Sequence, residues 1–157
     1  MAIRKVRELG DEVLRKRCKE VPKMTIRNKI LINDMLDTMY EAQGVGLAAP
    51  QVGILKRIVV IDVGDGPIVM VNPEILERSG EQTGNEGCLS LPGKAGTVTR
   101  PMYVKVKAYD QNMKPVILEG EELLARAMCH EIDHLEGHMY VEFAEGPLFD
   151  AENEEEG

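Results

Sequence analysis

Apolar residues recur with helical spacing in two separate stretches of the chain. From residue 25 to residue 43, apolar side chains stand at i, i+3, i+4 and i+7 counted from Ile32, and Gly44 follows. This spacing is typical of an amphipathic helix, and glycine commonly ends a helix. The stretch from about residue 121 to residue 136 has the same character and is followed by Gly137. We therefore expect one helix early in the chain and one late.

Between these helices the sequence changes to short β-rich segments separated by glycine and proline. The segments are 57–62, 68–72 and 102–109, and in the last of them valine and alanine alternate with two lysines. Such alternation predicts a half-buried antiparallel strand. A short apolar stretch at 139–143 is expected to add one more strand. The order helix, strands, helix predicts an α+β fold in which the late helix packs against short antiparallel sheets.

Length and composition limit the architecture and the kind of partner. With 157 residues, 43% of them hydrophobic, the chain is expected to form one compact domain over residues 1–147 and an acidic, disordered tail over 148–157. Because 27 acidic residues outnumber 19 lysines and arginines, direct nucleic-acid binding is not expected. The sequence shows no membrane span, signal peptide or disulfide framework. We expect a soluble cytoplasmic protein.

The sequence H-E-I-D-H begins at His130, inside the second predicted helix. Its two histidines, His130 and His134, lie one turn apart on one helix face, so both rings can reach one metal ion. Glu131 stands one residue round from the first ligand and can act as general base on a water molecule at the metal. Leu123 and Ala127 extend the same stripe, so we expect this face to point into the protein.

Two histidines leave a catalytic metal site one protein ligand short. Where an extended form of the motif carries a third histidine, this chain has Tyr140, and the late glutamates lie in the acidic tail. Cys129 points about 100° away round the helix, and Cys18 lies in a basic run that favours the thiolate but is not tied to the site. We predict Cys88 as third ligand, although an inert core cysteine would look the same in sequence. The set leaves one coordination position open for hydrolysis, and spacing alone suggests zinc.

Residues 44–51 form a third segment, which combines small residues with one amide side chain. Gly44 and Gly46 would let a substrate backbone lie close, and Gln51 offers a donor of the kind that stabilises an oxyanion. The same composition is also typical of a tight crossing from a helix to a strand. Substrate contact and a structural turn both stay open for this segment.

Taken together, the three segments resemble the peptide deformylase family, whose members carry a G-x-G-x-A-A-x-Q loop, an E-G-C-x-S loop and an H-E-x-x-H helix in this order. The matching residues are 44–51, 86–90 and 130–134, and the resemblance covers about residues 3–145. It implies removal of the N-formyl group from the initiating methionine of nascent peptides, with release of formate. The metal of the family is commonly Fe²⁺, which Zn²⁺ or Ni²⁺ can replace.

The resemblance also implies roles for individual residues. One divalent metal ion per chain would be held by Cys88, His130 and His134. Glu131 would be the general acid and base, and Gln51 would bind the developing oxyanion together with the backbone N–H of Leu89. Val45, Leu89 and Ala127 would border an apolar pocket for the methionine side chain.

Two further positions, Glu86 and Asp133, match the family and are expected to support the ligands rather than to react. Each is expected to hold a ligand or to pair with Arg100. The chain departs from the family at Cys129, where many members have glutamine. It also has an acidic end in place of the basic helix by which some members contact the ribosome, so transient ribosome docking is not supported by that route.

Two other functions are compatible with the same residues. A small H-E-x-x-H metallopeptidase would cut internal peptide bonds and would also use Glu131. A non-catalytic metal-binding module would keep its function after loss of that carboxylate.

Overall fold

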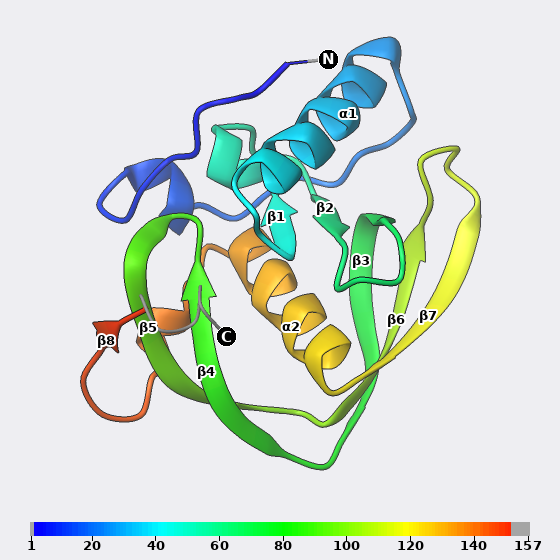
Figure 1. Cartoon of the computed structure of the whole chain (residues 1–157). Coiled ribbons are helices and arrows are strands. Elements are labelled where there is room, and N and C mark those ends of the chain that lie inside the picture. Colours follow the sequence, from blue (N-terminus) through cyan, green and yellow to red (C-terminus); the bar gives the residue numbers. More distant parts are fainter. Residues whose placement is uncertain (1, 152–157) are drawn as a thin grey trace.

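The computed structural model describes residues 2–151 and has an α+β fold, as the sequence predicts (Figure 1). Two α-helices, three short 3-10 helices and eight strands follow one another within these residues. They are η1 (Glu12–Arg15), α1 (Ile26–Glu41), β1 (Gly46–Ala48), η2 (Ala49–Val52), β2 (Ile58–Ile61), β3 (Ile68–Ser79), β4 (Gln82–Cys88), β5 (Leu91–Arg100), β6 (Tyr103–Tyr109), β7 (Pro115–Glu121), α2 (Leu123–Leu135), η3 (Tyr140–Glu142) and β8 (Phe149–Asp150).

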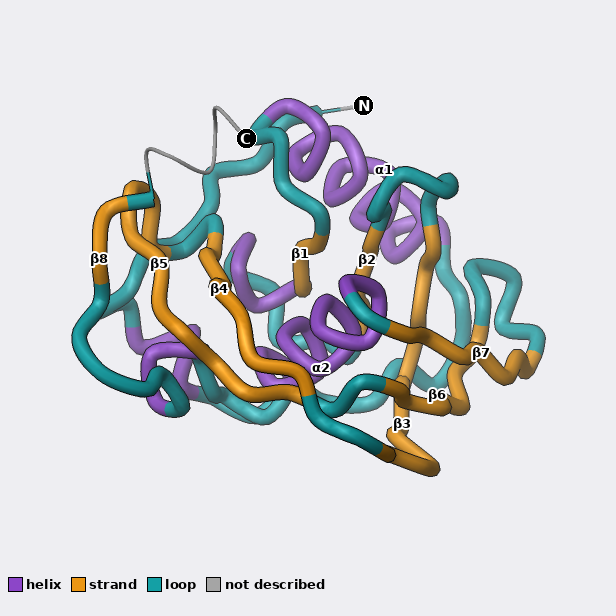
Figure 2. Tube along the Cα trace, turned by 60° about the horizontal axis from the view of Figure 1, so that its bottom comes forward, coloured by secondary structure: helices purple, strands orange, loops and turns teal. Residues whose placement is uncertain are grey.

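The strands form two antiparallel sheets. The larger has the order β1-β2-β3-β6-β7, and the smaller has the order β4-β5-β8. Helix α2 lies between them, with β4 and β5 on one side and β3, β6 and β7 on the other (Figure 2). Within residues 2–151, no helix combines the length and the apolar character that a membrane span requires.

Helix α1 occupies the stretch where the early helix was expected. The Thr25 side chain accepts a hydrogen bond from the backbone N–H of Asn28, which caps the first turn. Its buried side chains include Leu31, Met35 and Met39, which join the apolar cluster beneath β1 and β2. This packing fixes the end of α1 and therefore the start of the segment that follows it.

Helix α2 ends at a glycine that cannot be replaced without strain. Gly137 has φ +84°, and a Cβ there would collide with the backbone carbonyl of Arg15. The start of the helix differs from the expectation, because Leu123 is 49% exposed and does not extend the buried stripe. It is the first helical residue, whereas Ala127 one turn later is 4% exposed.

The strand predictions are confirmed in part. In β6, Val104, Val106 and Ala108 are fully buried, as the alternation predicts. The expected strands at 57–62 and 68–72 are present as β2 and the first part of β3.

Five strands were missed: β1, β4, β5, β7 and the two-residue β8. The strand expected at 139–143 is wrong. The Glu142 side chain accepts a hydrogen bond from the backbone N–H of Met139 at 2.9 Å, and this closes the helical turn η3 instead.

The tail is more ordered at its start than the sequence indicated. Phe149 and Asp150 form β8, which pairs with β5, and Asp150 Oδ1 lies 2.7 Å from Lys94 Nζ. The prediction of disorder is therefore wrong for these two residues, and the remainder of the tail, 152–157, lies outside the described residues.

Candidate metal centre and active site

Strand β4 and helix α2 bring three donor side chains together. Cys88 is the last residue of β4, and His130 and His134 lie one turn apart on α2. One donor atom of each side chain, a sulfur and two ring nitrogens, lies within 4.8 Å of the others. One of these contacts joins Cys88 Sγ to His134 Nε2 at 3.3 Å. The three residues that the sequence pointed to as ligands therefore converge in space.

The donor set fits a divalent metal ion. Nδ1 of His130 is 2.8 Å from Glu86 Oε1, which leaves Nε2 of that ring for a metal. His134 is fully buried, and among residues 2–151 its Nδ1 has no hydrogen-bond partner. Burial, followed by the neighbouring His130, lowers the pKa of His134, so its ring is neutral as a ligand must be. One sulfur and two nitrogens leave a tetrahedral ion one open position.

Glu131 is buried beside these donors and has an unused oxygen. It is 4% exposed, and its Oε1 has no hydrogen-bond partner within the described part of the chain. Burial raises the pKa of Glu131 to about 7. At Gly46 an added Cβ would lie 2.5 Å from Glu131 Oε2, so β1 needs glycine where it passes the carboxylate. The arrangement gives a carboxyl group that exchanges a proton near neutral pH.

Glu86 is the centre of a buried charged network. Its two oxygens accept hydrogen bonds from Nε and Nη2 of Arg100 at 2.7 and 2.9 Å, and Oε2 accepts a further one from Arg126 Nη1 at 2.7 Å. Arg100 Nη1 also donates to Asp133 Oδ2 at 2.6 Å. Burial alone would raise the pKa of Glu86, but the hydrogen bonds from Arg100 and His130 lower it to about 2. The expected pairing of Glu86 and Asp133 with Arg100 is confirmed.

His130 lies among acidic groups that offset its burial. Burial alone would lower its pKa, but the charge of Glu131 and the hydrogen bonds with Cys88 and Glu86 hold the pKa of His130 well above its ordinary value. A cation at this place is therefore electrostatically favoured, whether it is a proton on the ring or a bound metal ion.

Gln51 lies directly behind the thiol. Its Nε2 is 3.5 Å from Cys88 Sγ and 3.1 Å from Ser90 Oγ, while its Oε1 accepts a hydrogen bond from the N–H of Ala48 at 2.9 Å. The side chain is 1% exposed and fixed at both ends of its amide. Leu89, the next residue after Cys88, contacts the same region from the turn between β4 and β5.

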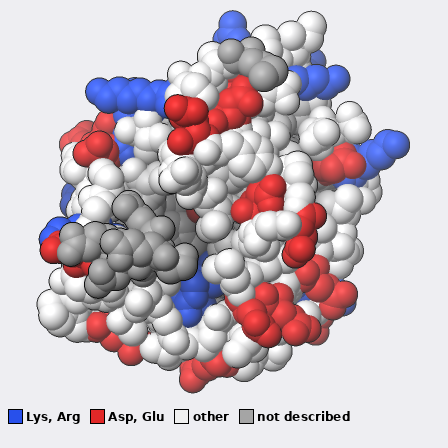
Figure 3. Space-filling model, in the orientation of Figure 1, with Lys and Arg blue, Asp and Glu red and all other residues white. Residues whose placement is uncertain are grey.

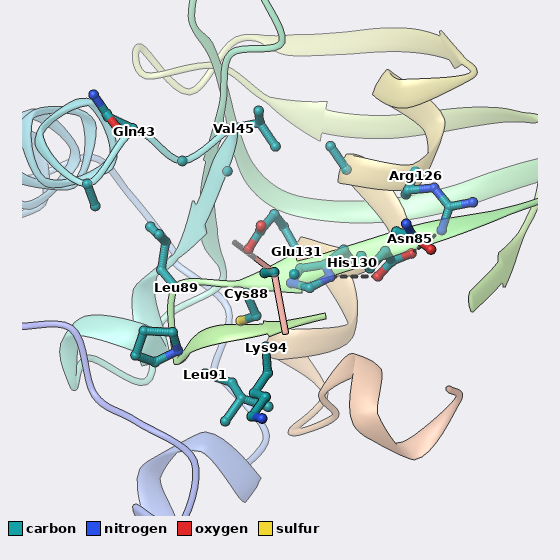
Figure 4. A pocket seen from close by; sticks show the side chains of 18 of the residues that line it. Gln43, Val45, Asn85, Cys88, Leu89, Leu91, Lys94, Arg126, His130 and Glu131 are labelled. Atoms are coloured by element: carbon teal, nitrogen blue, oxygen red, sulfur yellow. Dashed lines mark hydrogen bonds and ion pairs between the residues drawn. The ribbon is translucent and has the colours of Figure 1, made fainter. Parts of the chain in front are cut away.

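A cavity of about 630 Å³ opens onto these groups (Figure 4). The residues that line it include Gly44, Val45, Gly46, Leu89 and Ala127. At Gly44 an added Cβ would lie 2.8 Å from Leu89 Cδ1, so glycine allows the backbone to pack closely against the Leu89 side chain. Cys88, His130 and Glu131 also line this cavity.

The other two cysteines do not join the donor set. Cys129 is 6% exposed and packs in the apolar cluster between α2 and the larger sheet. Cys18 is 5% exposed, and burial raises its pKa to about 11, as it does for Cys129. The expectation that the basic run around Cys18 favours the thiolate is therefore wrong, because desolvation outweighs the nearby charges.

Arg126 is a residue of the site that the sequence did not single out. It lies one turn before His130 on α2, is 7% exposed and lines the cavity (Figure 4). Its place four residues before His130 puts the two side chains on one helix face, but this spacing does not distinguish a buried arginine from an exposed one.

Known proteins resemble the whole described chain. The polypeptide deformylase family model matches residues 3–147. The peptide deformylase of Agathobacter rectalis is 65% identical over 155 residues, which are 99% of this chain and 98% of that protein. The crystal structure of peptide deformylase from Thermotoga maritima has a TM-score of 0.91 and 42% identity, covering 93% of this chain and 100% of that one. That of Synechococcus elongatus, in complex with actinonin, has a TM-score of 0.87 and 44% identity, covering 90% and 78%. The chain belongs to the polypeptide deformylase family.

Proposed function

We propose that this chain is a metal-dependent hydrolase that removes the formyl group from the N-terminal formylmethionine of nascent polypeptides and releases formate. The observation that carries the proposal is the convergence of one sulfur and two ring nitrogens within 4.8 Å beside a buried carboxyl group at the wall of a cavity. Family membership supports the same reaction.

The metal site consists of Cys88, His130 and His134. We propose Fe²⁺ as the native ion, with Zn²⁺ or Ni²⁺ able to replace it, since the resemblance to the family implies iron and the thiolate and imidazole donors suit all three ions. When bound, the ion supplies a Lewis acid that lowers the pKa of water and polarises the formyl oxygen.

Glu131 moves the proton. With a pKa raised to about 7 by burial, its carboxylate accepts a proton from the attacking water and its acid form returns that proton to the leaving amine. Both steps need an oxygen that is not already hydrogen-bonded, and Oε1 meets this condition within the described residues.

Two amide groups are assigned to the oxygen of the formyl group. Gln51 Nε2 and the backbone N–H of Leu89 would donate to it as negative charge develops in the transition state. Since the Gln51 amide is held by Ala48 and Ser90, it does not need to reorient during the reaction. Each donor of this kind lowers the barrier by about 3 kcal/mol.

The cavity beside these groups takes the methionine and the residues that follow. Gly44, Val45 and Gly46 would contact the peptide backbone, and Val45, Leu89 and Ala127 would contact the methionine side chain. At about 630 Å³ the cavity exceeds a single side chain, which supports a peptide substrate. We also propose that the protein acts in the cytoplasm and meets nascent chains transiently at the ribosome, where this substrate is made.

The test is formate release from formyl-Met-Ala-Ser by protein loaded anaerobically with Fe²⁺. The wild type and a Cys18→Ala control should release formate, whereas Cys88→Ala and Glu131→Ala should lose at least a hundredfold in kcat/KM. Internal fragments without formate would instead indicate a metallopeptidase. Full activity in Glu131→Ala would contradict the assigned base and favour a metal-binding module.

A further inference from the structure

Arg126 has no part in the reaction proposed above, yet it is buried beside the ligands. Its Nη1 donates to Glu86 Oε2 at 2.7 Å and to the carbonyl oxygen of Val98 at 3.0 Å. Its Nη2 is 3.4 Å from the carbonyl oxygen of Gln82. Since Arg126 belongs to α2, Gln82 and Glu86 to β4 and Val98 to β5, one guanidinium joins the helix to two strands.

Alternate residues of β4 face α2. Three of them in succession contact the guanidinium of Arg126 or belong to the proposed metal site. At Gly84 an added Cβ would lie 3.3 Å from Arg126 Nη2, so glycine leaves the space that the guanidinium fills. Two residues on, Glu86 meets both Arg126 and Nδ1 of His130. Two residues further, Cys88 supplies the sulfur. One face of β4 thus provides the space for the guanidinium, the carboxylate that Arg126 and His130 share, and the sulfur of the proposed metal site.

The carboxylate of Glu86 is held so that it cannot turn. Oε1 accepts from His130 and Arg100, and Oε2 accepts from Arg100 and Arg126. Arg100 comes from β5, holds the carboxylate within the smaller sheet and also donates to Asp133 on α2. From α2 the carboxylate is held directly by His130 and Arg126, and of these two residues only Arg126 is not a proposed metal ligand.

We propose that Arg126 is a positioning residue that acts on His130 through Glu86. It sets the distance between the imidazoles on α2 and the thiolate on β4, and it holds the His130 ring with Nε2 toward the metal. The inference rests on the metal site of the proposed function and not on the reaction. A clamp that merely stabilised the packing of α2 on β4 would lower the resistance to unfolding and leave the metal affinity of the folded protein unchanged.

The experiment measures Co²⁺ binding rather than turnover. Wild type, Arg126→Met, Arg126→Lys and Arg4→Met are compared for Co²⁺ affinity by chelator competition, for the visible absorption of bound Co²⁺ and for thermal unfolding. Arg4→Met is the matched control, because it removes the arginine that pairs with the buried carboxylate of Asp34 on α1, and neither residue lines the cavity.

We expect Arg126→Met to weaken Co²⁺ binding about tenfold and to shift the visible bands, in line with the effect of groups that orient metal-bound histidines. Arg126→Lys, which keeps the charge and one donor, should recover most of the affinity. Arg4→Met should lower the melting temperature without changing the affinity. Wild-type affinity and spectrum in folded Arg126→Met would overturn the proposal.

A second variant covers the case in which Arg126→Met does not fold. Gly84→Ala keeps the arginine but pushes its guanidinium by a few tenths of an ångström, and it should weaken Co²⁺ binding severalfold with a shifted spectrum. Unchanged binding in this variant would contradict the proposal. If the wild type bound Co²⁺ as expected but released no formate with Fe²⁺, the proposed function would fail while the role of Arg126 would stand.

Discussion

Helix α2 presents two chemically different faces to the two sheets. Toward the larger sheet it buries apolar side chains, with Ala125, Met128 and Leu135 fully inaccessible. Toward β4 and β5 it presents Arg126 and His130, which share the carboxylate of Glu86. Apolar packing is non-directional and stabilises the fold in proportion to the area buried, whereas charged hydrogen bonds fix atoms in direction and distance.

The two faces of α2 therefore affect different properties of the protein, its stability and the positions of its site residues. The apolar face determines how firmly α2 is held in the domain, and the charged face determines where its ring nitrogens lie relative to the sulfur of Cys88. The outer surface offers a third setting, since acidic side chains gather at the lower right of Figure 3 over β6 and β7, where solvent screens them. Substitutions in the three settings should therefore differ in size and in kind.

The largest loss of stability is expected from Glu86→Gln. It leaves Arg126 buried without a carboxylate and Arg100 with Asp133 alone, which should lower the free energy of unfolding by about 3–5 kcal/mol. Urea denaturation followed by circular dichroism measures this loss, and Co²⁺ affinity should fall in the same variant. A loss of stability below about 1 kcal/mol would show that the network is not stabilising as a unit.

On the apolar face, Met128→Ala should lower the free energy of unfolding by about 3 kcal/mol through the cavity that it leaves. Because this side chain contacts the larger sheet and not the ligands, Co²⁺ affinity should stay within about twofold of the wild type, the usual result for sites that share no partners. A large loss of affinity would mean that the two faces are not independent.

The two carboxylates of the site should shift stability with pH in opposite directions in the metal-free protein. The pKa of Glu131 is raised from 4.5 to about 7, so its contribution to stability is present below pH 4.5 and is lost as the pH rises through 7. Glu131→Gln should therefore stabilise the protein by roughly 2–3 kcal/mol at pH 8 and by almost nothing at pH 4. The pKa of Glu86 is lowered to about 2, so its contribution is lost as the pH falls from 4.5 toward 2.

Urea unfolding with chelator present, at pH 4 and pH 8, checks this pair of signs. Equal stability differences between Glu131→Gln and wild type at the two pH values would contradict the raised pKa of Glu131.

The smallest effect is expected at the surface. Lys105 and Glu77 form an ion pair at 3.2 Å in which both side chains are more than a third exposed. Lys105→Met should change the free energy of unfolding by less than about 1 kcal/mol, as measured by urea denaturation. A loss as large as that of Glu86→Gln would remove the contrast between buried and exposed charges.

Periodicity was sufficient for elements with one uniformly apolar face. Helices α1 and α2 and strand β6 follow directly from their spacing, whereas β2, which is buried on both faces, follows from its run of β-branched residues. Strands β4 and β5 do not, because β4 is Q-T-G-N-E-G-C, and its inward residues are a glycine, an acid and a cysteine rather than aliphatic side chains. Their partners come from α2, some forty residues away in the chain. No local pattern contains that pairing.

The residues of the site that belong to short sequence motifs could be predicted. The spacing of His130 and His134 and the glycine beside Cys88 pointed to donors that the fold brings together. Arg126 was missed because its role depends on the space at Gly84, which exists only when β4 lies against α2. Cys18 was misjudged because neighbouring charges are visible in a sequence and burial is not.

The central claim is that Cys88, His130 and His134 hold one divalent ion together. X-ray absorption of protein loaded with one equivalent of Zn²⁺ tests it most directly. We predict one sulfur at about 2.3 Å and two imidazole nitrogens at about 2.0–2.1 Å, with the sulfur lost in Cys88→Ala and kept in Cys129→Ala. A wild-type spectrum without a sulfur ligand, or one whose sulfur survives the loss of Cys88, would contradict the account.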